Sequence, residues 1–526
     1  MRDFHLPGRS TVYASNAMVA TSHPLAAKVA VDILSEGGNA VDAAIAGAVL
    51  LGVCEPQMTG IGGDCFALVK PAGEERVVGL NGSGRAPAAL SADALRAAGH
   101  SSMPLYGDPA SVSIPGAIDA FARLSADYGR KGLDASLAPA IRYFEEGVPV
   151  APRVASDWAK SVGNLHGHGK AAFTVEGKAP AVGTVFKAPG QAEVLKRIAK
   201  DGRDAFYIGE VAEDMVATLQ AMGGVHTLED FAATACDYVE PISGTYRGTE
   251  LVELPPNGQG ATALQMAKMM ERFDIASLDP VGAERAHLEA EIAKLAYNAR
   301  DRFIADPEYV NRLDHVLSDA TADALVALIN PDTVIASAHD ASQAVHKDTI
   351  YITVVDQDRM AVSLIYSIFH SFGSGLATEK FGINFQNRGA GFSLTEGHPN
   401  EAGGGKRPMH TIIPAMLKED GRVSMSFGVM GGAYQPNGHA RFLSNLVDYQ
   451  MDLQAALDAP RSFGALGPLD LENGYAPDVW EALRAKGHTV QPPETAIGGA
   501  QAIHLGPDGL LTAASDPRKD GIALGF

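Results

Sequence analysis

The spacing of apolar residues divides the chain into two parts that meet near residue 349. In the first part apolar residues recur mostly at helical spacing, and we predict helices at residues 24–34 and 39–53, separated by a break at Gly37-Gly38. Two more helices are indicated by the start signal from Thr227 to Asp230 and by the stripe Leu288, Ile292, Leu295, Ala299 and Phe303. The first 340 residues are therefore predicted to be mainly helical, with apolar faces that must pack on one another or on a sheet.

From residue 349 onward the pattern favours strands. Residues 349–355 and 361–368 are rich in β-branched and aromatic side chains and flank the polar segment Gln357-Asp358-Arg359, which predicts a hairpin. Pairing Asp356 with Ala361 across the turn would bring Ser367 beside the start of the first strand. Further strands are predicted at residues 411–417, 423–427, 500–505 and 510–513, with a helix at 453–457. The C-terminal part therefore mixes helices and strands.

The composition is that of one large globular unit. The 526 residues are 46% hydrophobic and 20% charged, and no proline-rich, serine-rich or charge-run linker divides them. Three cysteines, Cys54, Cys65 and Cys236, cannot all be paired in disulfides, so we expect buried reduced thiols. A single composite unit is predicted rather than a string of modules.

The formal net charge of −20 argues against several partners. No clustered Lys/Arg stripe reverses that charge locally, so we expect no nucleic acid. The N-terminal residues lack the apolar run of a signal or anchor, and the most apolar stretch, residues 40–53, contains Asp42 and is too short to cross a bilayer. We therefore expect no membrane association, a cytoplasmic location, and a buried helix at this stretch.

Several short blocks carry a family resemblance. They are Ala14-Ser15-Asn16-Ala17-Met18-Val19-Ala20, Gly37-Gly38-Asn39-Ala40-Val41-Asp42-Ala43-Ala44, Glu55-Pro56-Gln57-Met58-Thr59-Gly60-Ile61-Gly62-Gly63-Asp64, Lys406-Arg407-Pro408, Gly428-Val429-Met430-Gly431-Gly432 and Ala514-Ser515-Asp516-Pro517-Arg518. In this order, from Tyr13 to the C-terminus, they resemble the γ-glutamyltranspeptidase family of N-terminal-nucleophile hydrolases. The resemblance implies an α+β fold, the αββα sandwich of that class. It also implies an α-chain, residues 1–348, and a β-chain, residues 349–526, that stay associated as one composite catalytic unit.

The resemblance further implies a nucleophile. In the family a threonine stands seven residues before the aspartate of a Val-Val-Asp triplet, and Asp356 puts that threonine at position 349. Taken alone, Thr349 indicates only the start of a strand. Cleavage of the processing bond between Asp348 and Thr349 would free an α-amine with a reference pKa of about 7.7–8.0, which can take the proton of the threonine hydroxyl. Nucleophile and base would then belong to one residue.

Two other positions match family residues that support this chemistry. Ser367 follows Thr349 by eighteen positions, where the family has a hydroxyl residue that supports the nucleophile; a strand-pair serine is the alternative. The pair Gly431-Gly432 matches the glycines whose backbone N–H groups bind the developing oxyanion, with a plain turn as the alternative. The implied catalytic set is therefore Thr349, Ser367, Gly431 and Gly432.

The family residues that recognise a γ-glutamyl group are altered in this chain. The arginine that grips the α-carboxylate is displaced by two positions, to Arg85. The typical asparagine twenty residues after the nucleophile becomes Phe369, and the aspartate that pairs with the substrate ammonium falls on Gly391. The usual Ser-Ser pair becomes His410-Thr411. Recognition of the amine is therefore predicted to be lost while the nucleophile is kept.

One replacement points to a different substrate. Arg388 takes the place of a neutral glutamine, and a guanidinium can hold a carboxylate by two parallel hydrogen bonds. An internal salt bridge or an exposed charge stays open as the alternative for Arg388 and for Arg85. The candidate substrate-binding residues are Arg85, Arg388, Phe369, His410 and Thr411.

Three other motifs carry no chemistry in this sequence. The pair His166 and His168 has no fixed third ligand, so we expect no metal and no cofactor. The segment Gly403-Gly404-Gly405-Lys406 is followed by Arg407 where a phosphate loop needs Ser or Thr. The segment Gly373-Ser374-Gly375 lacks the spacing of a nucleophile elbow.

The leading hypothesis is a self-processing amidohydrolase that cleaves a small carboxylate-bearing amide, such as oxamate or a dicarboxylic monoamide, through an acyl-threonine intermediate. Its expected partners are that substrate and the association of the two chains from one precursor, with room for a homo-oligomer. Two alternatives stay open. One is a γ-glutamyl hydrolase or transpeptidase acting on glutathione, or a glutaryl acylase. The other is an uncleaved, non-catalytic binding protein.

Overall fold

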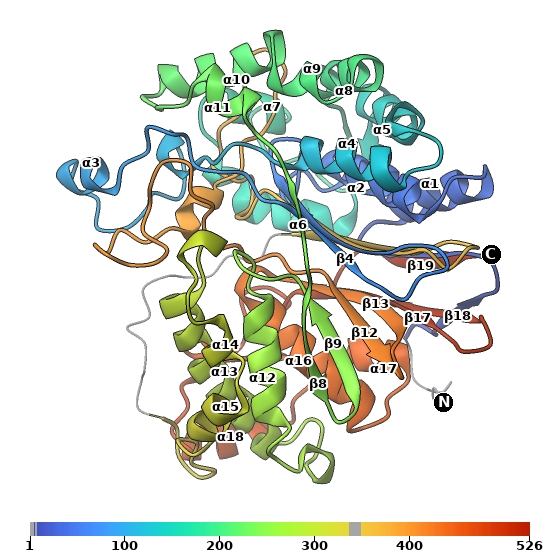
Figure 1. The fold of residues 1–526 in the computed structure, drawn as a ribbon, viewed down its shortest axis with the longest axis vertical. Helices are drawn as coiled ribbons and strands as arrows, with labels where there is room; N and C mark the ends of the chain where they lie inside the picture. The colour runs from blue at the N-terminus through green and yellow to red at the C-terminus, as the bar shows by residue number, and fades with distance from the viewer. Residues whose placement is uncertain (1–4, 6–7, 336–348) are drawn as a thin grey trace.

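The chain folds into four layers. The computed structural model describes residue 5, residues 8–335 and residues 349–526. Two seven-stranded antiparallel sheets stack face to face, and helices cover both outer faces (Figure 1). This arrangement confirms the predicted α+β fold of the αββα type. Asp348, on one side of the expected processing bond, lies outside the described residues.

Each sheet mixes strands from both parts of the sequence. Sheet 1 has the order β19 (Ile522–Gly525), β2 (Met18–Thr21), β10 (Ile350–Val355), β11 (Ala361–Ser367), β3 (Asp64–Lys70), β4 (Val78–Gly82) and β7 (Asp237–Val239). Sheet 2 has the order β1 (Val12–Ala14), β18 (Leu511–Ser515), β17 (Gly499–Leu505), β13 (Arg422–Met430), β12 (Ala415–Glu419), β9 (Thr249–Glu253) and β8 (Ile242–Tyr246). Residues before and after position 349 therefore share both sheets.

The central hairpin of sheet 1 is buried on both faces. Tyr351 and Ile365 point toward sheet 2 and join the core between the sheets. Ile352 and Leu364 point the other way, into the core beneath the helices. This double burial explains why strands β10 and β11 are continuous apolar runs rather than alternating ones.

The helix α2 (Ala40–Cys54) packs directly on this hairpin. Asn39 starts it with a capping box, and every residue of the helix is buried. Gly47 permits the close approach, because a Cβ at this position would lie 2.5 Å from Cδ1 of Ile352. At the turn that ends β10, a carboxylate oxygen of Asp356 accepts a hydrogen bond from the Ala40 amide at 2.9 Å. The family's marker aspartate thus joins the hairpin to the start of α2.

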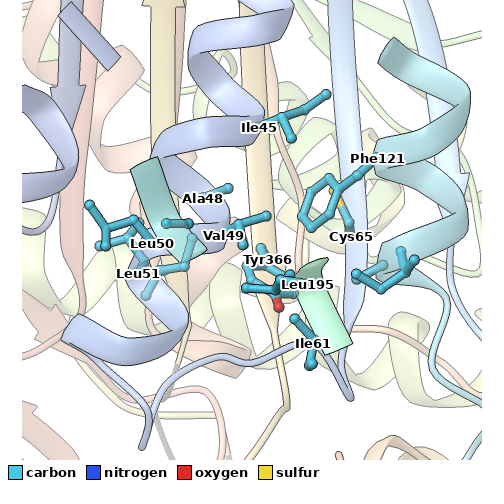
Figure 2. Packing of buried hydrophobic residues seen from close by; sticks show 14 of the residues in the cluster. Ile45, Ala48, Val49, Leu50, Leu51, Ile61, Cys65, Phe121, Leu195 and Tyr366 are labelled. Atoms are coloured by element: carbon cyan, nitrogen blue, oxygen red, sulfur yellow. The ribbon is translucent and has the colours of Figure 1, made fainter. Parts of the chain in front are cut away.

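More helices complete the layer over sheet 1. They are α1 (Pro24–Ser35), α4 (Ala117–Tyr128), α5 (Leu133–Glu146) and α8 (Pro189–Asp201). Figure 2 shows how side chains from these elements meet over the hairpin: Ile45, Ala48 and Val49 of α2, Phe121 of α4 and Leu195 of α8 surround Tyr366 and Cys65.

The opposite layer covers sheet 2. Its main helices are α12 (Gly260–Met270), α13 (Ala283–Phe303), α16 (Gln435–Val447) and α17 (Leu453–Asp458) (Figure 1). The remaining helices are α3 (Ala92–Ala97), α6 (Pro152–Ser161), α7 (His168–Phe173), α9 (Asp204–Tyr207), α10 (Glu210–Ala221), α11 (Leu228–Ala232), α14 (Leu313–Val316), α15 (Asp319–Val326) and α18 (Pro477–Ala485). Short strand pairings link β5 (Val148–Pro149) to β6 (Val185–Phe186), and β15 (Leu469–Leu471) to β14 (Ser462–Phe463) and β16 (Val490–Gln491).

The predicted elements were largely confirmed, with three corrections. The hairpin register is one residue off, because Val355 rather than Asp356 pairs with Ala361. The strand predicted at 411–417 begins only at Ala415. The first part is also less helical than predicted, since it supplies strands such as β3 to the centre of sheet 1.

The described cysteines agree with the expectation of buried reduced thiols. Cys54, Cys65 and Cys236 are free and buried. None of the helices in the described ranges is long and apolar enough to cross a membrane.

Candidate active site

Thr349 lies immediately before β10, opposite the end of β11. The ladder of the hairpin pairs Ile350 with Tyr366, so the next position places Thr349 beside Ser367. The Thr349 hydroxyl donates to Oγ of Ser367 at 3.3 Å, and both side chains are fully buried. Two residues eighteen positions apart are thus brought together by strand pairing alone. The interpretation of Ser367 as a hydroxyl partner of Thr349 agrees with this geometry.

The Ser367 hydroxyl oxygen accepts hydrogen bonds from several donors. It accepts from the backbone amide of Phe369 at 2.9 Å and from Nη2 of Arg388 at 3.2 Å, besides the Thr349 hydroxyl. Donors that converge on one oxygen hold it in place. The position of the Thr349 hydroxyl is therefore set by residues from two other segments of the chain, residues 367–369 and Arg388.

Arg388 is a fully buried cation in this cluster. Its Nη1 donates to the Thr411 hydroxyl at 2.8 Å, and its guanidinium lies over the ring of Phe369, 4.1 Å from the ring centre. Within the described part of the chain no ion pair reaches this guanidinium, and its Nε lacks a hydrogen-bond partner. Burial lowers its pKa to about 9, an effect only partly opposed by the charge of Asp64. The side chain stays protonated at neutral pH.

Asp64, whose charge opposes the fall in the pKa of Arg388, accepts several hydrogen bonds. Asp64, the first residue of β3, is fully buried. One of its oxygens accepts from the amides of Gly84 and Gly116, both at 3.0 Å, and from Nε2 of Gln386 at 2.9 Å. Its other oxygen lies 3.1 Å from Nε2 of His410. These donors stabilise a carboxylate that would otherwise be costly to bury.

His410 is a hydrogen-bond partner of the Asp64 carboxylate. Burial, together with the nearby charge of Arg388, lowers the pKa of His410 to about 3, although Asp64 raises it. The ring is therefore neutral at pH 7, and Nε2 carries the proton that faces Asp64. His410 thus bonds to Asp64, whereas Arg388 bonds to Thr411 and to Ser367 and so belongs to the hydrogen-bonded chain that reaches Thr349.

Phe369 occupies a strained backbone position beside Ser367. Its φ angle is +81°, a region that a bulky residue rarely adopts. The strain is compensated locally, because the amide of Phe369 bonds to Ser367 and its ring stacks on His370 at 4.2 Å and lies against Arg388. Such outliers cluster at functional sites.

The glycine pair follows β13 of sheet 2. Gly431 and Gly432 both have positive φ, +128° and +55°, which a residue with a side chain rarely adopts. Gln259, just before α12, donates to the carbonyl oxygens of Gly432 at 2.9 Å and Thr411 at 2.6 Å. The glycine pair is thereby linked to Thr349 through Gln259, Thr411, Arg388 and Ser367. The two sheets contribute to one connected polar network.

Two other positions from the sequence analysis lie differently. Arg85 is not brought into the cluster: its side chain is 43% exposed, and its guanidinium pairs with Asp306 at 3.3 Å and donates to the Gly405 carbonyl at 3.0 Å. Gly391 has no room for a side chain, because a Cβ there would lie 2.6 Å from the carbonyl oxygen of Met409. An aspartate cannot occupy that position without a shift of the backbone.

Sequence reasoning missed three buried side chains of this network. They are Asp64, Gln259 and Gln386. A signal existed for Asp64, which stands between Gly60-Ile61-Gly62-Gly63 and a run of five apolar residues, the mark of a loop that enters a buried strand. No local pattern distinguishes the two glutamines, whose partners are distant in sequence.

Comparison with known proteins places this geometry in a family. The model of the gamma-glutamyltranspeptidase family matches residues 26–526. A glutathione hydrolase-like proenzyme, YwrD, of Bacillus subtilis (strain 168) is 34% identical over 528 residues, covering 98% of this chain and 99% of the relative. The oxamate amidohydrolase proenzyme of Klebsiella pneumoniae subsp. pneumoniae is also 34% identical, over 535 residues, covering 98% of this chain and 100% of the relative.

A solved structure gives the same result in three dimensions. The cephalosporin acylase from Bacillus halodurans superposes with a TM-score of 0.92 at 38% sequence identity, covering 100% of this chain and 99% of the acylase. Sequence and fold therefore agree over the whole length, and the chain belongs to the gamma-glutamyltranspeptidase family of N-terminal-nucleophile hydrolases.

Proposed function

We propose that this hydrolase is a self-processing amidohydrolase whose nucleophile is Thr349 and whose substrate is a small amide that carries a carboxylate. The observation that carries the proposal is the buried contact between the hydroxyls of Thr349 and Ser367, 3.3 Å apart, beside a buried guanidinium without an ion-pair partner in the described residues. Cleavage before Thr349 would divide the precursor into residues 1–348 and 349–526. Because each sheet contains strands from both parts, the two chains would stay associated.

The proposed reaction has two balanced halves. The Thr349 oxygen attacks the amide carbonyl while the α-amine takes the hydroxyl proton. The C–N bond then breaks, that proton goes to the departing amine, and an ester on Thr349 remains. Water attacks the ester while the same amine takes its proton, the bond between the acyl carbon and the Thr349 oxygen breaks, that oxygen regains the proton, and the carboxylic acid leaves. The backbone N–H groups of Gly431 and Gly432 are the proposed donors to the tetrahedral oxyanion in both halves.

The proposed substrate class rests on the charges around the nucleophile. Arg388 offers a buried positive charge with an unused Nε, which suits a substrate carboxylate. No aspartate stands at Gly391 to pair with an ammonium, and the space there is closed by Met409. A carboxylate without a neighbouring amine fits this arrangement better than a γ-glutamyl group. Oxamate and dicarboxylic monoamides share that chemistry.

An acylase activity on a dicarboxylic acyl group is the second candidate. It is favoured by the fold similarity to a protein named as a cephalosporin acylase, which extends over the whole chain. Both candidates use the same nucleophile and the same carboxylate contact. They differ in the size of the leaving amine, which kinetics can measure.

The nucleophile is tested by processing. Purified protein is expected to show two masses that sum to the precursor plus one water, with Thr349 as a new N-terminus. Thr349→Ala should remain a single chain, whereas Thr349→Ser should still be cleaved because it keeps a hydroxyl. Thr333→Ala, at an exposed threonine, is the matched control and should be cleaved normally. A wild-type protein that stays intact would refute the proposal.

The substrate class is tested on the processed enzyme. Oxamate, glutaryl amides and a γ-glutamyl anilide are compared by kcat/KM, each against a neutral amide of similar length. The proposal expects the substrates that lack an α-amine to be preferred. A preference for the γ-glutamyl compound would restore the glutathione alternative.

A further inference from the structure

A polar cluster far from Thr349 in the sequence lies in the helical layer over sheet 2. It consists of His287 and Glu291 on α13 and His488, which lies between α18 and β16. The ligand atoms of these three buried side chains all lie within 4.8 Å of one another. His287 and Glu291 are one helical turn apart, so both point from the same face of α13. The fold thus brings together three groups that are typical ligands of a transition metal.

The hydrogen bonds of the cluster define which atoms face one another. His287 Nε2 lies 2.8 Å from the carbonyl oxygen of Asn330, so that nitrogen carries a proton and Nδ1 presents a lone pair. That Nδ1 lies 2.8 Å from Nε2 of His488. A hydrogen bond from the other ring N–H to a backbone carbonyl is the arrangement that orients a metal-binding histidine.

We propose that His287, Glu291 and His488 bind one Zn²⁺-like transition-metal ion, with water as its fourth ligand. Two imidazoles and a carboxylate form a set that zinc prefers and that magnesium does not. A tetrahedral ion with metal–nitrogen bonds of about 2.0–2.1 Å holds its ligand atoms roughly 3.3 Å apart, so the two imidazole nitrogens need to separate by about 0.5 Å. The ion replaces the hydrogen between the rings, and that proton moves to Nδ1 of His488.

The cluster also contains the groups that compete with a metal. Nζ of Lys294 lies 2.6 Å from one oxygen of Glu291, and the amide of Ile335 donates to the other oxygen at 2.6 Å. Lys294 is 18% exposed, so its ammonium can move to solvent when an ion takes its place. Lys486 donates to the Pro331 carbonyl at 2.8 Å and adds a second positive charge near His488. The positive charges of Lys294 and Lys486 therefore lower the affinity of the site for a metal cation.

The residues of the proposed metal site come from both sides of position 349. His287 and Glu291 precede residue 349, and His488 follows it. The Asn330 carbonyl and the Ile335 amide, near the end of the described first part, contact His287 and Glu291 directly. In a protein cleaved before Thr349, the ion joins the two chains. This consequence rests on the proposed function, whereas metal binding itself does not.

Metal binding is tested first on the uncleaved Thr349→Ala protein, so that failure of processing and failure of the metal site are distinguishable. After stripping with a chelator and dialysis against Zn²⁺, elemental analysis is expected to find about one zinc per chain. Calorimetry should show tight binding of Zn²⁺ and none of Mg²⁺. Absence of retained zinc would overturn the proposal.

Three variants separate a built site from adventitious binding. His488→Ala should lose the retained zinc, and His168→Ala, at an exposed histidine elsewhere, should keep it. Lys294→Gln is expected to bind zinc several-fold more tightly, because it removes the competing ammonium. If the cluster has a purely structural role, none of these proteins should retain zinc, and Lys294→Gln should only lose stability. Equal zinc in His488→Ala and wild type would also contradict the site.

The joining of the chains is tested on the processed wild-type protein. Size-exclusion chromatography in mild urea should show the two chains separating at a lower urea concentration after zinc removal than before it. The same shift should be absent in His488→Ala. An unchanged urea midpoint on zinc removal would show that the ion does not join the chains.

Discussion

Replacing Arg388 by methionine should make the enzyme less active and more stable at the same time. In the folded chain, burial lowers the pKa of Arg388 from its ordinary value to about 9. A fall of this size corresponds to about 5 kcal/mol that disfavours the charged form in the folded state. Because both pKa values lie above 7, the unfavourable effect is fully present at neutral pH. It is lost only as the pH rises above about 9 toward the ordinary pKa of arginine.

The opposing contributions are smaller. The hydrogen bonds of Arg388 to Ser367 and Thr411 are charge-assisted and contribute about 1.5 kcal/mol each. Methionine keeps an unbranched apolar stem over the ring of Phe369. Arg388→Met is therefore expected to raise the free energy of unfolding by about 2 kcal/mol at pH 7, the difference between roughly 5 and roughly 3.

Activity should change in the opposite direction. If Arg388 holds the substrate carboxylate by two charge-assisted bonds of about 1.5–3 kcal/mol each, kcat/KM falls by roughly two to four orders of magnitude. A neutral amide of the same length should lose little. The assay pairs these kinetics with denaturant unfolding in the uncleaved Thr349→Ala background, where unfolding involves one chain.

Arg142→Met, at an exposed arginine, is the matched control and should change neither quantity. A stability loss of more than about 2 kcal/mol in Arg388→Met would refute the idea that the buried charge is unfavourable for folding. An equal loss of kcat/KM on the charged and neutral amides would show that Arg388 orients Ser367 instead of holding a carboxylate.

Other predictions concern the surrounding network and the pH dependence of stability. Ser367→Ala should slow processing about 10- to 100-fold, measured by the rate at which the precursor mass disappears, because the Arg388 and Phe369 donors lose their shared acceptor. Gly391→Asp should destabilise the protein by about 3 kcal/mol or more in denaturant unfolding, and it should not create γ-glutamyl activity, since its Cβ meets a carbonyl oxygen at 2.6 Å. Burial raises the pKa of Glu55 from 4.5 to about 7, so its folded form keeps a proton that the unfolded form has lost. The free energy of unfolding should therefore fall by about 3 kcal/mol between pH 4.5 and 7, and Glu55→Gln should abolish that component of the pH dependence. A pH profile of unfolding that is the same in both proteins would contradict this assignment.

Much of the fold was predictable because local signals were strong. The break at Gly37-Gly38 and the apolar run after it indicated α2, and the β-branched runs around residues 357–359 indicated the central hairpin. The register was one residue off because a turn sequence constrains pairing only loosely, whereas side-chain packing on both faces fixes it. The strand β3 was missed because it is fully buried and lacks the alternation that marks an exposed sheet.

The sequence by itself determined the family, and it predicted the position of the nucleophile and the loss of the residues that bind a γ-glutamyl amine. These conclusions follow from short motifs, in which residue type and order are sufficient. Only the tertiary structure decided what the individual charges face. Arg388 and Arg85 are the same type of residue, and the sequence does not distinguish their surroundings. The fold buries Arg388 beside Ser367 and pairs Arg85 with Asp306. Electrostatic and hydrogen-bond roles depend on distance and burial, and these arise only when segments far apart in the sequence pack together.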